Sequence, residues 1–254
     1  MDKHILLFSS GVDSFVGYYY LKKEHDLDKV HLVHLFNSNT KYAQAELYYV
    51  NKCREIIKDD EITVLPVKFP VSEDSDSFIP ARNLLFALQS VLDVAYPDYD
   101  RIYVYLGGLR DDRVSDNSPE YVETLSKTLS LSCNKDIIVK SVFDYKLSKY
   151  EIVKWFVENL PDQVNNLVDY TFSCYNPKGI EPCYLCRACF RRNVVLQDII
   201  LLPFRDKKLL KQWYKDFKEH PQDYDEIRRR ESIRYIERLQ RAETVLEKEA
   251  LHEL

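Results

Sequence analysis

Short apolar runs alternate with longer amphipathic stretches along residues 1–160, and this alternation limits the fold more than any other feature. Val, Ile and Leu dominate the runs, as they do in strands buried on both faces; the runs are 4–8, 30–36, 62–67, 101–106 and 137–142. Helical periodicity follows each run, over 13–23, 41–57, 83–95, 119–131 and 149–159. Ser118 and Ser148 are predicted N-caps of the last two helices. The pattern predicts a doubly wound α/β fold with a five-stranded, mostly parallel sheet.

The composition permits this fold and narrows the class of protein. The chain has 254 residues, of which 45% are hydrophobic and 30% are charged, which is enough for a sizeable core. A net charge of −5 argues against general nucleic-acid binding, and the apolar runs are too short to cross a membrane. The N-terminal segment has no signal-peptide pattern, so we expect a cytoplasmic protein. We expect a nucleotide-binding domain over 1–165, a metal-binding segment over 166–203 and a helical extension over 204–254.

The helical extension carries two patterns that each allow two interpretations. An apolar stripe favours packing within the chain and leaves open a dimer or partner contact; its members are Ile236, Leu239, Leu246 and Ala250. The basic run 228–230 is surrounded by acids, which favours a solvated face over a phosphate-binding patch.

Four of the six cysteines are crowded into one turn-rich segment. They follow the spacing C-x8-C-x2-C-x2-C, at Cys174, Cys183, Cys186 and Cys189. Overlapping Cys-x2-Cys steps bring three thiolates round one centre, as a tetrahedral Zn²⁺ requires. Disulfides are the alternative, but cysteines at every third position pair poorly with one another. We therefore predict a structural zinc site that keeps no open position for water.

A short polar loop separates the first predicted strand from the first predicted helix. Its residues are Ser9, Ser10, Gly11, Val12, Asp13 and Ser14. The first turn of a helix offers unpaired N–H groups and a partial positive charge, which suit a phosphate group. The loop has neither a Gly-Lys-Ser/Thr ending nor a G-x-G-x-x-G pattern. Because parallel sheets bind ligands at the carboxyl ends of their strands, the loops 68–82 and 107–117 are the other candidate regions.

This loop resembles the Ser-Gly-Gly-x-Asp-Ser loop of N-type ATP pyrophosphatases. With the four cysteines, it makes the chain similar to the 7-cyano-7-deazaguanine synthase (QueC) family, in which such a loop opens the chain and a four-cysteine zinc site closes it. Further segments carry the same resemblance, which covers residues 1–203: Ile79–Asn83, Asp116–Tyr121, Lys149–Ile152 and Thr171–Ser173.

The resemblance implies an AMP-forming ligase that adenylates 7-carboxy-7-deazaguanine and passes the acyl group to ammonia, giving an amide and then the nitrile. It implies ATP and pyrophosphate at Ser9–Ser14, and Mg²⁺ held by Asp13 with Asp111 or Asp112. Its catalytic candidates are Asp13, Arg82 and Lys149, although arginine and lysine are also common at exposed helix starts. Its substrate-binding candidates are Asn83, Gly107, Arg110, Asp111, Asp112, Asp116 and Arg192.

Three departures from the family pattern leave the acceptor open. Ser10 replaces the first loop glycine, Tyr184 replaces a glycine between two cysteines, and the segment 107–116 is shorter than its counterpart and lacks a Gly-Tyr-Pro-Asp element. One alternative is a paralogue that joins the deazaguanine acyl group to a protein amine, as relatives in antiphage defence operons suggest. The other is a zinc protein that binds nucleotide without catalysis.

Overall fold

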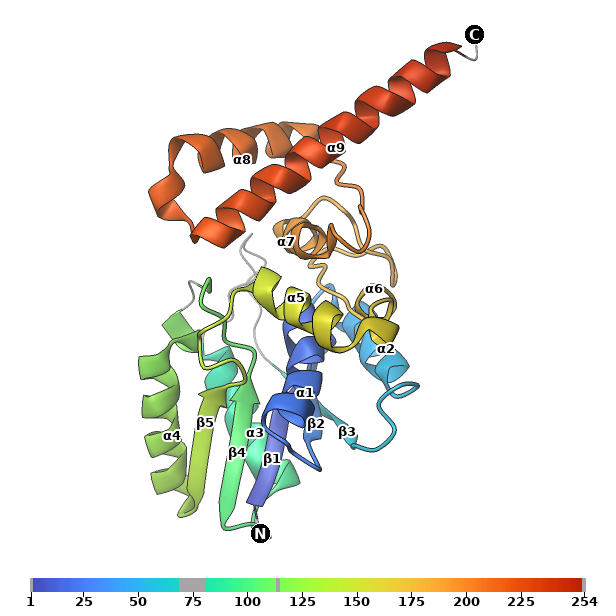
Figure 1. Ribbon diagram of the computed structural model, residues 1–254. Coiled ribbons are helices and arrows are strands. Elements are labelled where there is room, and N and C mark those ends of the chain that lie inside the picture. The colour runs from blue at the N-terminus through green and yellow to red at the C-terminus, as the bar shows by residue number, and fades with distance from the viewer. Residues whose placement is uncertain (1, 69–80, 113–114, 253–254) are drawn as a thin grey trace.

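Five parallel strands form the centre of the molecule, as the sequence predicts. The computed structural model describes residues 2–68, 81–112 and 115–252, and the side chains as far as residue 242. The strands follow the order β3-β2-β1-β4-β5 and every neighbouring pair is parallel (Figure 1). Their bounds are β1 Asp2–Leu7, β2 His31–Asn37, β3 Ile62–Val67, β4 Arg101–Leu106 and β5 Asp136–Ser141. The family-like residues Ile79 and Pro80, and positions 113 and 114 of the loop after β4, lie outside the described residues.

Helices cover both faces of the sheet because neighbouring strand residues point to opposite sides. Leu6 and Leu32 pack in the core beneath α1 (Val12–Glu24), α2 (Ala43–Cys53) and α5 (Lys149–Asn159). Ile5 and Val33, one position away in each strand, pack beneath α3 (Arg82–Val94) and α4 (Pro119–Cys133). The two apolar cores account for the near-continuous apolar runs in the sequence.

Both predicted serine caps are confirmed. The Ser118 hydroxyl accepts a hydrogen bond from the Tyr121 N–H, and Pro119 occupies the first turn of α4. Ser148 and Glu151 form a reciprocal capping box at the start of α5. This box fixes the position of Lys149, the first residue of α5.

The strand order places a change of direction between β1 and β4. From β1 the chain continues to β2 and β3 on one side, whereas β4 and β5 lie on the other. Ligands of doubly wound sheets bind at the carboxyl ends of the strands at this switch point. The loop 8–11 follows β1 and the loop 107–112 follows β4, so the two candidate loops meet there.

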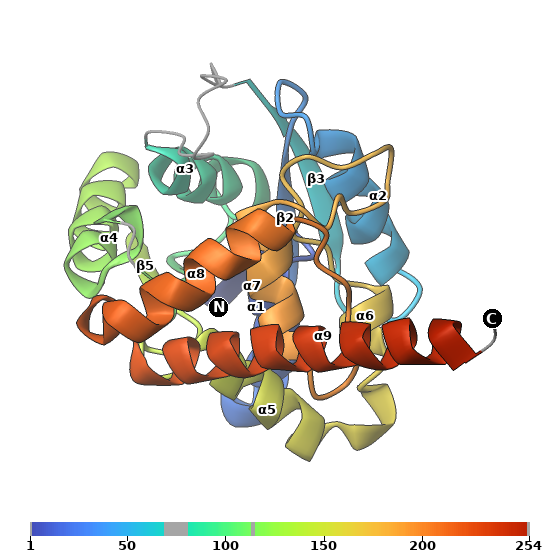
Figure 2. The same cartoon turned by 90° about the horizontal axis from the view of Figure 1, so that it is seen from above.

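The C-terminal part of the chain lies over this edge of the sheet (Figures 1 and 2). It contains α6 (Asn166–Asp169), α7 (Arg187–Leu196), α8 (Lys207–Glu219) and α9 (Glu226–His252), and single turns of 3₁₀ helix occur at 115–117, 161–163 and 221–223. Phe190 of α7 packs in one core with Phe217 of α8 and Ile236 of α9. Leu239 packs against the same core, so this half of the apolar stripe serves the chain's own fold. The side chains of Leu246 and Ala250 lie outside the described part.

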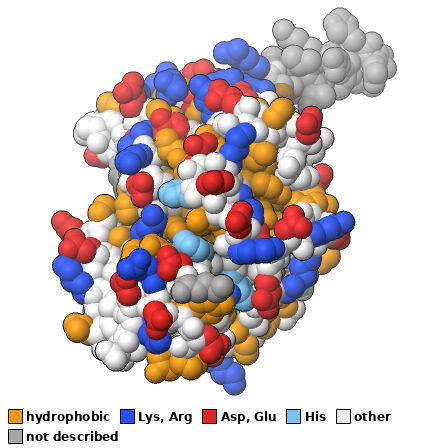
Figure 3. All heavy atoms as spheres, turned by 60° about the horizontal axis from the view of Figure 1, so that its bottom comes forward, with side chains coloured by type: hydrophobic (Ala, Val, Ile, Leu, Met, Phe, Trp, Pro, Cys, Tyr) orange, Lys and Arg blue, Asp and Glu red, His pale blue; other side chains and the backbone are white. Residues whose placement is uncertain are grey.

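On the face seen in Figure 3, lysine and arginine side chains are interspersed with aspartate and glutamate. That face carries no single-sign patch of the kind that attracts nucleic acid. Among the described residues, no helix combines the length and the apolar character that a membrane span requires.

His34 of β2 supports the start of the candidate loop and makes stability depend on pH. Its Nδ1 lies 3.1 Å from the Phe8 carbonyl oxygen, and its side chain is 2% exposed. Burial lowers the pKa of His34 to about 4. An unfolded histidine has a pKa of about 6.5, so between pH 4 and pH 6.5 the folded state binds fewer protons than the unfolded state. The stability contributed by neutral His34 is present above pH 6.5 and is lost as the pH falls toward 4.

As the pH falls from 7.5 to 5, we therefore expect the free energy of unfolding to decrease by about 2 kcal/mol, because His34 takes up a proton more readily in the unfolded state. Urea unfolding of the wild type and of His34→Gln at both pH values measures this loss. The variant should be less stable at pH 7.5 but should show a shallower decline. Equal declines in the two proteins would show that His34 titrates normally in the fold.

Candidate active site at the switch point

The loop after β1 leads directly into the first turn of α1. Gly11 is the N-cap residue of α1, and the Ser14 hydroxyl accepts from the Ser9 N–H and donates to the Gly11 carbonyl oxygen. These bonds hold the loop closed against the helix. The N–H groups of Val12, Asp13 and Ser14 belong to the first turn, where a helix has no partner of its own for them. The loop thus has the form of an anion site at a helix N-terminus.

Ser10 adopts the left-handed backbone conformation at the turn of this loop, with φ of 56°. Glycine adopts this conformation without strain, whereas a residue with a β-carbon does so at a cost of about 1 kcal/mol. Two bonds hold Ser10 in place: its hydroxyl donates to the Ser9 carbonyl oxygen, and its own carbonyl accepts from the Phe172 N–H. The segment just before the cysteine cluster therefore stabilises the loop through a hydrogen bond. Ser10 adopts the same backbone conformation that a glycine would adopt at this position.

Asp13 and Lys149 come from opposite ends of the α/β region and meet at the switch point. Lys149 Nζ lies 2.9 Å from Asp13 Oδ2, across 136 residues of sequence. The lysine side chain is 12% exposed and the aspartate side chain 30%, so the pair stands at the edge of solvent. A carboxylate and an ammonium group are thereby held beside the N–H groups of the loop.

Two further carboxylates and one arginine extend this pair. Asp111 accepts from the Lys149 N–H, and Asp112 accepts from the Leu109 N–H. Arg191 of α7 lies 3.8 Å from Asp111 Oδ2 and 3.5 Å from Asp112 Oδ1. Burial and then the negative charge of Asp13 raise the pKa of Asp112. Burial disfavours the charged form of Arg191, but the neighbouring carboxylates outweigh this and raise the pKa of its guanidinium.

Two adjacent glycines allow the loop after β4 to pack closely against Asp13 and Tyr145. A β-carbon on Gly107 would lie 3.2 Å from the Asp13 β-carbon, and one on Gly108 would lie 2.5 Å from the Tyr145 ring. Three buried polar atoms around the glycines have no hydrogen-bond partner among the described residues: Asp13 Oδ1, Asn117 Oδ1 and the Tyr145 hydroxyl. Buried polar atoms normally have partners, so unpaired atoms beside these glycines are candidate contacts for a ligand or an ion.

Other candidates from the sequence lie outside this cluster. Arg82 is close to Glu46, whose pKa burial raises to about 8 against the opposing charge of Arg82. Asn83 donates to the Asp116 backbone carbonyl oxygen at 2.7 Å, so these two residues tie α3 to the loop after β4. Within the described structure, Arg82 has no recorded bond to Asp13 or Lys149. Its catalytic role stays a prediction.

Two arginines predicted to bind substrate have structural partners. Arg110 pairs with Glu151 at 2.9 Å and with Asp225 at 3.3 Å, which joins the loop after β4 to α5 and to the tail. Arg192 is 6% exposed and donates to the Thr171 hydroxyl and to backbone carbonyls at 168 and 171. Its neighbour Arg191 is the residue of α7 that reaches the carboxylates.

The four cysteine side chains converge, as their spacing predicts. Their Sγ atoms all lie within 4.8 Å of one another, and three recorded separations are 3.5, 3.9 and 4.0 Å. A tetrahedral Zn²⁺ with Zn–S bonds of about 2.3 Å would separate its thiolates by about 3.8 Å. All six cysteines are free, so the described structure contains none of the disulfides that were the alternative to a metal site. The cluster can hold a metal with four thiolates.

The cluster also has backbone support. Cys174 Sγ accepts from the N–H groups of Asn176 and Cys183, and Cys183 Sγ accepts from the Leu185 N–H. These bonds stabilise negative charge on sulfur. Because Phe172 donates to the loop and also packs against the cluster, the metal-binding segment is joined to the candidate active site.

Comparisons with known proteins show the family of the chain. A family model described as "Queuosine biosynthesis protein QueC" matches residues 54–200, which is more than half of the chain. The chain therefore belongs to the QueC family. The matched region contains Lys149, Asp111 and the four cysteines; it begins after the Ser9–Ser14 loop and ends before α8.

Curated QueC relatives extend the match. The 7-cyano-7-deazaguanine synthase of Methanococcus maripaludis (strain C5) is 27% identical over 224 residues, which span 75% of this chain and 92% of the relative. The protein of the same name from Leptospira biflexa serovar Patoc (strain Patoc 1 / Ames) is 22% identical over 216 residues, spanning 74% and 87%. The similarity is distant but covers nearly the whole length of these relatives.

Proposed function

We propose that this chain uses ATP to activate the carboxylate of 7-carboxy-7-deazaguanine and transfers the acyl group to ammonia. The observation that carries the proposal is the Asp13–Lys149 pair at the first turn of α1, in a chain of the QueC family. The names of the relatives supply the product, 7-cyano-7-deazaguanine. ATP, Mg²⁺ and a structural Zn²⁺ are the proposed small-molecule and metal partners.

In the first half of this reaction, the adenylation step, the residues of the site have separate roles. The substrate carboxylate attacks the α-phosphorus of ATP and pyrophosphate leaves, which gives an acyl adenylate. The N–H groups of 12–14 hold the departing pyrophosphate, and Lys149 offsets the charge that builds up on the phosphate oxygens. Asp13, with its orphaned Oδ1, and Asp112 provide hard oxygen donors of the kind Mg²⁺ prefers. Bound there, the ion would screen the phosphate charge.

The second half transfers the acyl group and then dehydrates the product. Ammonia attacks the acyl carbon and AMP leaves, because AMP is a far better leaving group than hydroxide. A second ATP activates the amide oxygen in the same way, and loss of AMP with two protons gives the nitrile. One site that activates an oxygen on the same carbon serves both steps.

Incubation of the pure protein with ATP, Mg²⁺, 7-carboxy-7-deazaguanine and ammonium tests the proposal. We expect release of AMP and a small-molecule product with the mass of 7-cyano-7-deazaguanine. Amide without nitrile would limit the proposal to one round of activation, and turnover only in the presence of a protein acceptor would replace ammonia by a protein amine. Absence of ATP cleavage under all these conditions would contradict the proposal.

A further inference from the structure

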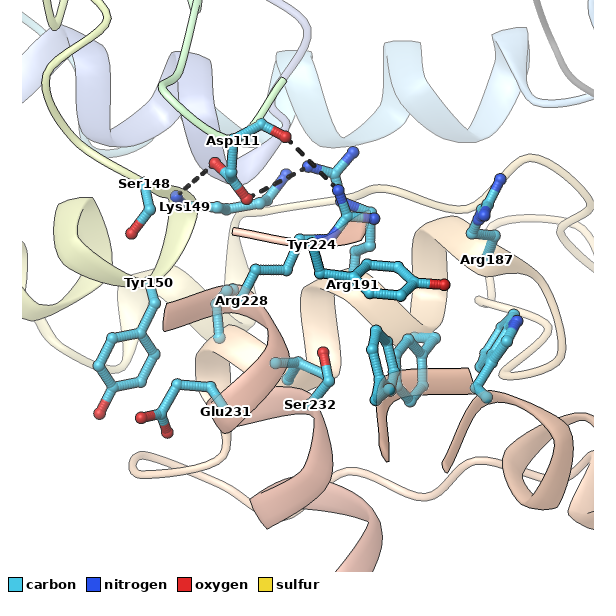
Figure 4. A pocket seen from close by; sticks show the side chains of 15 residues that line it. Asp111, Ser148, Lys149, Tyr150, Arg187, Arg191, Tyr224, Arg228, Glu231 and Ser232 are labelled. Carbon is cyan, nitrogen blue, oxygen red and sulfur yellow. Dashed lines mark hydrogen bonds and ion pairs between the residues drawn. The ribbon is translucent and has the colours of Figure 1, made fainter. Parts of the chain in front are cut away.

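A pocket lies between the candidate active site and the C-terminal extension (Figure 4). Its inner end is formed by Asp111, Ser148 and Lys149, and α7 provides a second wall. The tail closes it with residues of α8 and α9, among them Trp213 and Arg228. Because the QueC family model ends at residue 200, this outer wall is an addition to the matched region.

The charges around the pocket favour an anion. The described residues that line it include four cations and two carboxylates: Lys149, Arg187, Arg191, Arg228, Asp111 and Glu231. Glu231 is already paired with Arg230 and Arg234, Asp111 with Arg191, and Lys149 with Asp13, so the lining itself still holds more cations than carboxylates. An ammonium-bearing ligand would face an excess of like charge there, whereas a carboxylate would meet guanidinium groups that can bind it through two N–H donors.

The walls favour a flat, ring-shaped body on that anion. Phe190 and Trp213 present aromatic surface to the pocket, and Val194 adds apolar surface beside them. Ser232 of α9 is 2% exposed and its hydroxyl points into the pocket (Figure 4). Aromatic walls with one or two polar groups are typical of sites for heteroaromatic molecules.

Lys149 connects this pocket to the nucleotide loop. Its backbone N–H binds Asp111 at the inner end of the pocket, while its Nζ binds Asp13 beside the first turn of α1. A carboxylate at the inner end would thus lie next to the phosphate that it must attack.

We propose that this pocket binds the flat heteroaromatic carboxylate substrate, with its carboxylate at Lys149 and Arg191 and its ring against the tail. The inference rests on the proposed function, and it makes the C-terminal extension part of the substrate site. Arg228 reaches the Asp111 carbonyl oxygen at 3.4 Å, so the tail contacts the inner end of the pocket directly.

Binding measurements on two tail variants test this inference. Arg228→Gln removes a lining cation, and Ser232→Leu fills the space in front of α9. Each should weaken binding of 7-carboxy-7-deazaguanine, measured by calorimetry without ATP, by about tenfold or more. Binding of a non-hydrolysable ATP analogue with Mg²⁺ should change less than about twofold, because the loop at α1 is untouched.

An adjacent variant serves as the control. Arg229→Gln removes an arginine of α9 that does not line the pocket, so it should bind the carboxylate nearly as the wild type does. Thermal melting checks that each variant is folded. If Ser232→Leu does not fold, the comparison of Arg228→Gln with the wild type remains a test of the inference.

The outcomes separate this inference from the proposed function. Unchanged carboxylate binding in folded variants, while the wild type still releases AMP, would overturn the pocket assignment alone. Weaker binding of the ATP analogue with unchanged carboxylate binding would assign the pocket to the nucleotide and would also overturn it. A wild type that neither binds the carboxylate nor cleaves ATP would overturn the proposed function first.

Discussion

Replacement of Asp13 by asparagine is expected to reduce carboxylate-dependent AMP release on the order of 10³-fold. The substitution keeps the shape of the side chain but removes the charge that faces Lys149 at 2.9 Å and the carboxylate offered to Mg²⁺. An amide oxygen can still accept from Lys149, so the fold should be retained. The stability change should stay within about 1 kcal/mol, as for other partly exposed ion pairs.

Asp26→Asn is the matched control for Asp13→Asn. Asp26 follows the same helix, is exposed, and has φ of 52°, a conformation that asparagine adopts readily. Its AMP release should equal that of the wild type. If Asp13→Asn retained most of the wild-type rate while folded, the reaction centre would not lie at the β1 loop.

Replacement of Cys183 by serine is expected to cause the largest loss of stability. Cys183 is 4% exposed and its Sγ lies 3.9 Å from that of Cys189. Three thiolates bind Zn²⁺ much more weakly than four, and the free energy of binding a structural metal contributes directly to folding. Bound zinc, measured by atomic emission, should fall from one per chain to well below one. The melting temperature should fall by about 10 °C or more.

Cys133→Ser is the control for this prediction. Cys133 ends α4, is partly exposed and stands apart from the cluster. Its zinc content and melting temperature should be close to those of the wild type. A Cys183→Ser protein that kept both its metal and its stability would contradict a structural four-thiolate site.

The fold could be predicted because its determinants are local. Periodicity marked each strand, and the bounds of β3 and β4 agree with the predicted runs at 62–67 and 101–106. The hydroxyl groups of Ser118 and Ser148 fix the starts of α4 and α5 through short-range bonds that a sequence records directly. The cysteine spacing predicted convergence in the same way.

The site was predicted less completely because its contacts are long-range. Arg191 and Arg192 are adjacent in α7, but successive helix residues point about 100° apart, so only one reaches Asp111 and Asp112. The packing of α7 decides which one, and no local pattern records that. The sequence favours a solvated face for Arg228, whereas in the structure Arg228 lines the pocket and contacts Asp111 across 117 residues. The acidic residues that surround Arg228 in the sequence predict its neighbours along α9. They carry no information about the loop after β4, which α9 approaches in the fold.

We propose that the cluster around Asp13 and Lys149 activates a carboxylate with ATP. Exchange of labelled pyrophosphate into ATP by the pure protein tests this step without regard to the acceptor. We expect exchange that requires Mg²⁺ and 7-carboxy-7-deazaguanine, needs no ammonium and is lost in Asp13→Asn. Exchange that proceeds equally without the carboxylate, or none in a folded, zinc-loaded protein that binds both ligands, would contradict it.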